Sequence, residues 1–344
     1  MSAVTSLDEK TLTSYLQSQV HGFKGPITIT KFEGGQSNPT FKLEAASGSY
    51  VLRRQPPGKL LKSAHAVDRE YRVLAALRDT DVPVADVYHL CEDPTIIGSM
   101  FYIMQFCEGN IHWASSLKTI DGNIQRRAMY DEMNRVLAAI HSVDLQQVGL
   151  SDYGRPGNYF QRQYERWSAQ YQASEIDKII EMDRLISWLS DNIPADDGKV
   201  SLVHGDYRLD NLIFSADNSR VIAVLDWELS TLGHPYADLA YQCMGFRLPS
   251  HDSPGISSGL AGIDRNAIGI PSEEDYVAQY CQRMGIQSIE NWPFYLAFSF
   301  FRVAAICQGV AKRAVDGNAS SSKASSYQQM VKPLAQSALD AIGQ

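Results

Sequence analysis

The chain has 344 residues, of which 44% are hydrophobic and 20% charged, a composition typical of a folded globular protein that is long enough for two domains. Its formal net charge of −8 argues against a nucleic-acid partner, which would require a concentrated basic surface. The sequence shows no signal peptide, and its most apolar stretch, 292–306, is shorter than the about 20 residues that cross a bilayer. We therefore expect no membrane partner and a cytoplasmic location, in which the five scattered cysteines stay reduced.

The first part of the chain is predicted to form a small sheet with one helix. Strands are expected at 27–30, 40–43, 50–53 and 100–104. Between the first two strands lies the turn Gly34-Gly35-Gln36-Ser37, whose backbone N–H groups would cover phosphates unless it is an ordinary hairpin turn. A helix is expected over 65–78, because apolar residues recur there on one helical face.

A buried ion pair is predicted between the third strand and this helix. Side chains alternate along a strand, so Val51 and Arg53 share one face of the sheet, and Glu70 falls on the apolar stripe of the helix. A carboxylate on such a stripe requires a cationic partner, because an unpaired buried charge is costly. Arg53 is the expected partner, and the adjacent Arg54 is the alternative if the strand register differs by one residue.

The segment after the fourth predicted strand is expected to join two lobes. Gln105 to Cys107 would form the hinge between the lobes, with Met104 in the strand before it. The alternative is an ordinary connection between a strand and a helix. The hinge interpretation divides the chain into an N-terminal lobe, 1–105, and a C-terminal lobe, 106–344.

The second lobe is predicted to be mainly helical. Helices are expected at 124–142, 158–190, 273–284 and 292–314. The long loop 247–273 is a candidate lid or substrate wall, and 315–326 is a second long loop. The fold class is therefore α+β, with a small antiparallel sheet that precedes a larger helical lobe.

The clearest chemical motif is His204-Gly205-Asp206-Tyr207-Arg208-Leu209-Asp210-Asn211, which is followed by Asp226 after a predicted hairpin. In an antiparallel hairpin the start of one strand lies beside the end of the other. We therefore expect Asn211 and Asp226 at one end of the hairpin, where the loop that carries Asp206 enters. One carboxylate to orient a hydroxyl and two oxygen ligands for Mg²⁺ are what phosphoryl transfer from a metal-bound nucleotide requires.

This motif resembles the catalytic loop and metal-binding segment of the aminoglycoside phosphotransferase and choline kinase family, a branch of the protein-kinase-like fold. The segment from Gly233 to Ala240 fits the same family. Longer stretches, at 34–40, 51–54 and 294–298, are similar to the phosphotransferase domains fused to acyl-CoA dehydrogenases. The resemblance covers nearly the whole chain. It implies a two-lobed kinase-like enzyme that uses ATP, in preference to GTP, together with Mg²⁺.

The same resemblance suggests what the motif residues do. Asp206 would accept the proton of the attacking hydroxyl or orient it. Arg208 would offset charge on the moving phosphoryl group, or it would simply pair with Asp210. Asn211 and Asp226 would hold Mg²⁺.

Other positions are assigned supporting roles. His204 would hold the loop backbone, and Asp238 would brace the loop or cap the helix that it opens. The resemblance also implies that Gln105 to Cys107 offer backbone groups to a nucleotide base, with Met104 behind the ring. The lobe 1–105 would then bind the nucleotide, and the lobe 106–344 would be the catalytic and substrate-binding lobe. Kinase-like folds use a lysine to pair with the helix glutamate and to hold the nucleotide phosphates. This chain departs from that pattern, because it offers Arg53 to Glu70.

Three other classes of protein remain as alternatives. A protein kinase is disfavoured, because the six residues between Asp226 and Gly233 leave no room for an activation segment. A non-catalytic nucleotide-binding module would be marked by loss of Asp206 or Asp226, and both are present. A metallohydrolase would use His204, Asp206, His234 and Asp238.

The acceptor is expected to be a small molecule with a hydroxyl group, and an aminoglycoside is the less favoured choice. Polycationic antibiotics require a cluster of acidic side chains, whereas the helical lobe carries basic and aromatic ones. These are Arg247, Arg265, Arg302, Lys312 and Arg313, with Phe294, Tyr295, Phe298 and Phe301. They favour an anionic or partly apolar acceptor, and the resemblance suggests a hydroxylated acyl thioester. An aminoglycoside, another sugar or an amino alcohol remains the alternative.

Overall fold

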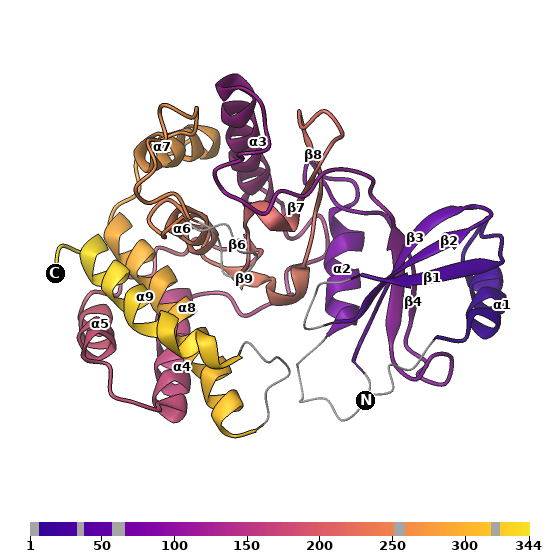
Figure 1. Ribbon diagram of the computed structural model, residues 1–344, viewed down its shortest axis with the longest axis horizontal. Coiled ribbons are helices and arrows are strands. Elements are labelled where there is room, and N and C mark those ends of the chain that lie inside the picture. Colours follow the sequence, from indigo (N-terminus) through magenta and orange to yellow (C-terminus); the bar gives the residue numbers. More distant parts are fainter. Residues whose placement is uncertain (1–6, 33–37, 57–65, 251–258, 318–323) are drawn as a thin grey trace.

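The computed structural model has the two-lobed α+β architecture that the sequence predicts (Figure 1). It describes residues 7–32, 38–56, 66–250, 259–317 and 324–344. The Gly-rich turn at 34–37 lies outside the described residues, as does 251–258 within the predicted lid or wall. The predicted lobe boundary at 105/106 stays a prediction.

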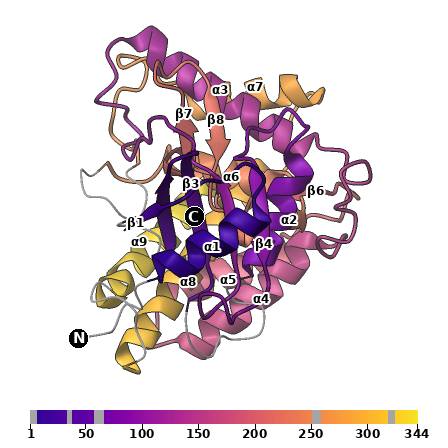
Figure 2. The ribbon, with the colours of Figure 1, turned by 90° about the vertical axis from the view of Figure 1, so that its right-hand side faces the viewer.

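The N-terminal lobe is an antiparallel sheet with one helix on each face. In the described part of this lobe the strand order is β1-β2-β3-β5-β4. The strands are β1 (Ile27–Lys31), β2 (Thr40–Ala45), β3 (Gly48–Arg54), β4 (Val87–Cys91) and β5 (Phe101–Gln105). Helix α1 (Glu9–Gln19) covers the outer face, and α2 (Val67–Leu77) lies between the sheet and the helical lobe (Figures 1 and 2).

Strand alternation decides which residues of β3 face each helix. Leu52 packs with Leu12 and Ile103 under α1, whereas Val51 packs in the cluster that contains Leu74 of α2. Arg53 therefore faces α2 and the helical lobe. The predicted register is confirmed, and Arg54, the alternative partner of Glu70, instead donates from its Nε to the hydroxyl of Ser99 at 2.9 Å.

The C-terminal lobe is built from helices around a long apolar one. They are α3 (Asn123–His141), α4 (Tyr159–Ser174), α5 (Ile180–Asp191), α6 (Tyr236–Met244), α7 (Glu273–Met284), α8 (Trp292–Val315) and α9 (Gln328–Ala341). Helix α8 packs against α4, α5, α6 and α9. Its length and composition would suffice to cross a membrane, but 78% of its most apolar window is buried among these neighbours, as in the core helix of a folded domain.

One predicted helix, 158–190, is wrong as a single element. The chain leaves the helical conformation after α4 ends at Ser174 and starts again at Ile180. The interruption allows α5 to pack against α4, α8 and α9, so that Met182, Leu185 and Leu189 are all buried. Burial of a second apolar face outweighs the continuous helical pattern in this stretch.

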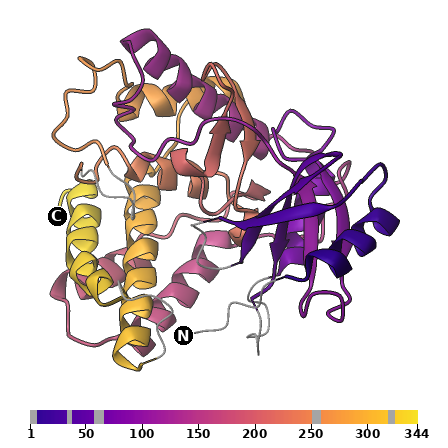
Figure 3. The ribbon, with the colours of Figure 1, turned by 45° about the vertical axis from the view of Figure 1, so that its right-hand side comes forward.

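Short strands at the lobe junction position the chemical motif. Strand β6 (Ser201–Val203) pairs with β9 (Thr231–Gly233), and β7 (Leu212–Phe214) forms the predicted hairpin with β8 (Val221–Val224). The hairpin lies between the helical lobe and the sheet (Figure 3). It touches the N-terminal lobe through a hydrogen bond of 2.9 Å from the Val224 amide to the Pro83 carbonyl.

Candidate active site

The buried side chain of Asp238, on α6, holds the loop between β6 and β7 in place. Asp238 is 0% exposed and accepts hydrogen bonds from the backbone amides of His204 at 2.6 Å and Gly205 at 2.8 Å. Burial would raise the pKa of Asp238, but the hydrogen bond from His141 and the loop amides outweigh burial and leave this pKa lowered. The carboxylate is therefore ionised and braces the loop backbone.

The conformation of the loop depends on a glycine and a histidine. Gly205 has φ +85°, and a Cβ at this position would lie 2.7 Å from the Leu229 carbonyl oxygen, so only glycine fits. The His204 ring accepts from the Asp206 amide through Nδ1 at 3.2 Å and donates from Nε2 to the Leu225 carbonyl at 2.8 Å. His204 thus ties the loop to the end of the hairpin.

The carboxylate of Asp206 is held by two side chains. The Tyr241 hydroxyl donates to Oδ1 at 2.6 Å, and Asn211 Nδ2 donates to Oδ2 at 3.0 Å. Arg208 Nε lies 3.5 Å from Oδ1, while its Nη2 pairs with Asp210 Oδ2 at 3.1 Å. Both roles considered for Arg208 are therefore geometrically open, since it approaches Asp206 and Asp210 together.

Asp226 lies at the end of the hairpin beside Asn211, as the antiparallel geometry predicts. The Leu225 amide donates to the Asn211 carbonyl at 2.8 Å, which joins the two strand ends. Asp226 has φ +64° and ψ +57°, a left-handed conformation that non-glycine residues rarely adopt and that is concentrated at functional sites. The turn directs its carboxylate toward the N-terminal lobe.

The predicted ion pair between Arg53 and Glu70 is confirmed, with Arg53 Nε 2.7 Å from Glu70 Oε2. Glu70 is 1% exposed and also accepts from Asn38 Nδ2 at 2.7 Å and from the Tyr102 hydroxyl at 3.1 Å. Burial raises the pKa of Glu70, and Arg53 offsets part of that rise. Arg53 Nη2 also donates to Asp226 Oδ1 at 2.6 Å, so the arginine bridges α2 and the hairpin end.

The surrounding carboxylates keep this arginine charged. Burial would lower the pKa of Arg53, but the negative charges of Glu70, Asp226 and Glu228 outweigh burial and raise it. Glu228 Oε2 is 3.7 Å from Arg53 Nη2, so Glu228 lies beside the same guanidinium as Glu70 and Asp226.

The predicted hinge follows β5 at the junction of the lobes. Met104 is buried in β5 opposite Val51, and Cys107 is half-buried, which raises the pKa of its thiol. The backbone amide of Gln105 donates to the Asp86 carbonyl at 2.7 Å. Of the three proposed hinge residues, Gln105 therefore uses its amide within the sheet, and a base would have to find its donor further along the segment.

The oxygen atoms at the hairpin end suit Mg²⁺. Burial raises the pKa of Asp210 and Arg208 opposes the rise, while the nearby negative charges of Asp206 and Asp226 add to it. Within the described ranges no group of three or more His, Cys, Asp or Glu side chains forms a ready metal cage. Mg²⁺ is usually bound by one or two protein carboxylates, and phosphate and water oxygens complete its coordination. The Asp226 carboxylate, with the amide oxygen of Asn211, could hold the ion in this way.

The metallohydrolase alternative does not fit these contacts. His234 Nε2 lies 3.2 Å from Asp197 Oδ1, and its Nδ1 accepts from the Tyr236 amide at 3.3 Å. Asp238 is occupied by loop amides, as described above. All four side chains of that alternative are therefore already engaged in hydrogen bonds.

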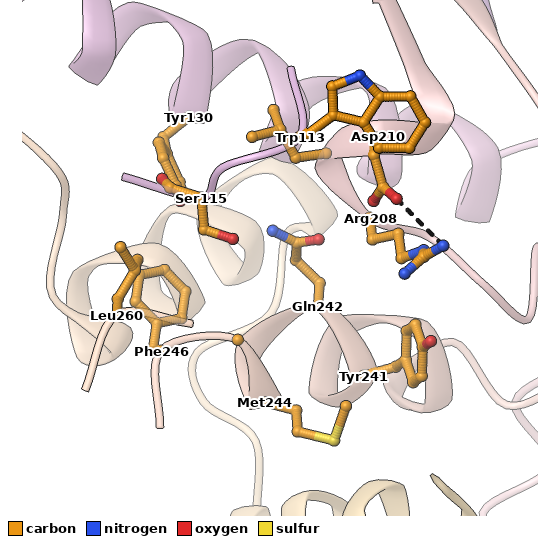
Figure 4. Close-up of a pocket in the computed structure, with 12 residues that line it drawn as sticks. Trp113, Ser115, Tyr130, Arg208, Asp210, Tyr241, Gln242, Met244, Phe246 and Leu260 are labelled. Atoms are coloured by element: carbon orange, nitrogen blue, oxygen red, sulfur yellow. Dashed lines mark hydrogen bonds and ion pairs between the residues drawn. The ribbon is translucent and has the colours of Figure 1, made fainter. Parts of the chain in front are cut away.

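A small cavity, partly open to solvent, lies against the catalytic loop (Figure 4). Arg208, Asp210 and Tyr241 form its wall on the loop side. The rest of the lining includes Trp113, Ser115, Tyr130, Gln242, Phe246 and Leu260. Tyr130, Phe246 and Leu260 lie at one end, and Trp113 and Tyr241 lie near Arg208 and Asp210 at the other (Figure 4). Aromatic side chains beside a few charged groups are typical of a small-molecule site.

The residues that the sequence suggested for the acceptor side do not form this cavity. Phe294, Tyr295, Phe298 and Phe301 are at most 5% exposed and belong to the core around α8. The cations are mostly engaged elsewhere: Arg247 Nε is 2.7 Å from Glu273, Lys312 pairs with Asp316, and Arg302 Nη2 donates to the Gly205 carbonyl at 2.7 Å. The cavity beside the loop is therefore the better guide to the acceptor.

Sequence reasoning missed Tyr241 as a site residue. Tyr241 follows Asp238 by three positions on α6, so both side chains lie on the helix face that meets the catalytic loop. The three-residue spacing from Asp238 could therefore have identified Tyr241 from the sequence. Trp113 and Phe246 come from a loop and a helix end, where no periodic pattern marks them.

Known proteins resemble this chain in sequence. The phosphotransferase enzyme family matches residues 28–263. Acyl-CoA dehydrogenase family member 10 of Mus musculus is 48% identical over 316 residues, which cover 92% of this chain but 29% of that protein, so the chain spans less than a third of that relative.

Solved structures agree with the sequence comparisons. A candidate aminoglycoside phosphotransferase from Ralstonia eutropha is 49% identical, with a TM-score of 0.88 and coverage of 98% of this chain and 99% of that one. Aminoglycoside phosphotransferase APH(4)-Ia, solved with ADP and hygromycin B, is 15% identical with a TM-score of 0.62 over 98% and 99% of the two chains, which shows the shared fold. Because the family model covers residues 28–263, which are more than half of the chain, this protein belongs to the phosphotransferase enzyme family.

Proposed function

We propose that this phosphotransferase moves the γ-phosphoryl group of ATP onto a hydroxyl group of a small molecule. The observation that carries the proposal is the Asp206 carboxylate, which is fixed by Tyr241 and Asn211. Tyr241 also lines the cavity, and Asn211 lies at the hairpin end where Asp226 contacts Arg53. A hydroxyl in that cavity would meet the carboxylate on one side and nucleotide phosphates on the other.

Each residue has a distinct role in this scheme. Arg53, oriented by Glu70, would hold the phosphates, and Asn211 with Asp226 would hold Mg²⁺. Bound Mg²⁺ would neutralise charge that develops on the phosphate oxygens. Asp206 would accept the hydrogen bond of the attacking hydroxyl and then its proton. ATP is preferred as donor by family membership, and the ADP complex of APH(4)-Ia supports that choice.

The cavity supports an acceptor that is partly apolar. Among the described residues that line it, the sole carboxylate is Asp210, and Arg208 already neutralises it at 3.1 Å. A polycationic aminoglycoside needs several unneutralised acidic groups. Trp113, Tyr130 and Phe246 instead offer aromatic surface to a chain or ring.

A hydroxylated acyl thioester is the acceptor class that we favour, and an aminoglycoside or another sugar is the second candidate. The similarity to an acyl-CoA dehydrogenase family member supports the first, and the name of the Ralstonia eutropha protein supports the second. Steady-state ADP release should be measured with hydroxyacyl-CoA compounds and with kanamycin-type sugars. Efficient turnover of the sugars, with none of the thioesters, would reverse this preference.

A further inference from the structure

Tyr241 contacts the Asp206 carboxylate from α6, a helix that lies outside the catalytic-loop motif 204–211. Its hydroxyl donates to Asp206 Oδ1 at 2.6 Å, from the second turn of α6. Asn211 occupies the other oxygen, Oδ2, at 3.0 Å. With one donor on each oxygen, the plane of the carboxylate is fixed, because rotation about its terminal bond would break both hydrogen bonds.

The tyrosine is itself held in place by α8. The Arg302 guanidinium lies 5.6 Å from the centre of the Tyr241 ring, within cation–π range, and its Nη2 donates to the Gly205 carbonyl at 2.7 Å. Arg302 therefore touches both the ring that orients Asp206 and the loop that carries Asp206. The arrangement couples the loop to two helices of the core.

The hydroxyl is available as a donor over the whole working range of pH. Burial raises the pKa of Tyr241, and the neighbouring Asp206 charge raises it further, although Arg208 opposes the rise. Tyr241 also lines the cavity next to Arg208 and Asp210. The group that orients the carboxylate thus stands at the wall where an acceptor would enter (Figure 4).

We propose that Tyr241 is a positioning residue, whose hydroxyl aligns the Asp206 carboxylate with the acceptor hydroxyl in the cavity. This inference rests on the proposed function. The two oxygens of Asp206 then have different roles. Oδ2 accepts a hydrogen bond from Asn211, the proposed Mg²⁺ ligand, and Oδ1 accepts one from Tyr241, which lines the acceptor cavity. Without the tyrosine hydroxyl, Asp206 would swing between orientations, and fewer of them would meet the acceptor.

The test is the variant Tyr241→Phe, which removes the hydroxyl and keeps the ring beside Arg302. We expect kcat to fall about 10- to 100-fold, the range for one hydrogen bond to a charged group, while the KM for ATP and calorimetric ATP affinity change by less than about twofold. Tyr164→Phe is the matched control, because it also removes one tyrosine hydroxyl bond, to the Ile186 carbonyl at 3.1 Å, away from the loop. This control should keep wild-type kcat.

A double-mutant cycle with Asp206→Asn separates positioning from a general structural effect. If Tyr241 acts through the carboxylate, Tyr241→Phe should lower kcat by less than about twofold in the Asp206→Asn background. The inference is overturned if Tyr241→Phe retains wild-type kcat, if it costs as much in both backgrounds, or if its melting midpoint falls well below that of Tyr164→Phe. Absence of turnover by the wild type with every alcohol would instead refute the proposed function, and this inference with it.

Discussion

Arg53 and Asp226 form an ion pair across the lobe junction, with Arg53 Nη2 2.6 Å from Asp226 Oδ1. The residue proposed to hold the phosphates thus contacts the residue proposed to hold Mg²⁺. An arginine can make this contact while its Nε stays 2.7 Å from Glu70, whereas a lysine has a single ammonium group to share. A nucleotide would compete with Asp226 for Arg53, so binding should exchange the ion pair for phosphate and metal contacts.

Substitution of Arg53, which contacts both Glu70 and Asp226, tests the role of this bridge in nucleotide binding. Arg53→Lys should weaken ATP binding, and Arg53→Ala should weaken it about 10- to 100-fold, because a charge-assisted contact to phosphate is lost. Arg54→Lys is the matched control, since Arg54 lies on the opposite face of β3 and contacts Ser99. Isothermal titration with Mg·ATP measures all of these affinities. Equal losses at positions 53 and 54 would show that the face of β3 does not matter for nucleotide binding.

Asp226→Asn should reduce the extent to which Mg²⁺ strengthens ATP binding. Without Mg²⁺, the variant should bind ATP more tightly than wild type, because Arg53 is released and one negative charge near the phosphates is removed. With Mg²⁺, the order should reverse, because a carboxylate ligand is lost. Titrations in chelator and in excess Mg²⁺ give the comparison. The same ratio of the two affinities in wild type and variant would rule out a metal role for Asp226.

The bracing of the catalytic loop by Asp238 should depend on pH. Because the pKa of Asp238 is lowered in the folded protein, its contribution to stability is present above the unfolded pKa of about 4 and is lost as the pH falls through the folded value. Asp238→Asn should cost about 2–4 kcal/mol of unfolding free energy at pH 7, because it loses the ionised acceptor of two amides.

Chemical denaturation of both proteins at several pH values measures this difference. The gap between wild type and Asp238→Asn should narrow as the pH is lowered below about 4, because the unfolded wild-type chain then takes up a proton on this carboxylate before the folded protein does. A gap that is constant from pH 7 to pH 3 would mean that the charge of Asp238 does not stabilise the loop.

Local patterns in the sequence were enough to predict the centre of the site. The hairpin brought Asn211 beside Asp226, and strand alternation with the helix stripe identified the pair Arg53–Glu70. Both predictions depend on short-range geometry, namely the antiparallel ladder and the periods of strand and helix. The folded structure keeps both of these local arrangements.

Packing between distant segments explains what the sequence did not predict. The aromatic residues of α8 occur on all sides of the helix, which marks a buried core helix and not a substrate surface. Arg302 reaches the Gly205 carbonyl over 97 positions in the chain, and no spacing rule links them. Helices α1 and α9 were missed because they are amphipathic segments flanking the strong motifs, and their docking decides their structure.

Acceptor-dependent phosphoryl transfer tests the central claim most directly. ADP release should be followed at saturating Mg·ATP with a panel of alcohols, and the phosphorylated acceptor should be identified by ³¹P NMR. We expect wild type to form an acceptor phosphate ester, and Asp206→Asn to lose about 10²–10⁴-fold in kcat with ATP affinity nearly intact, since a general base acts as the hydroxyl attacks. Wild-type turnover by Asp206→Asn, or ADP release by wild type without any phosphorylated acceptor, would contradict the proposed mechanism.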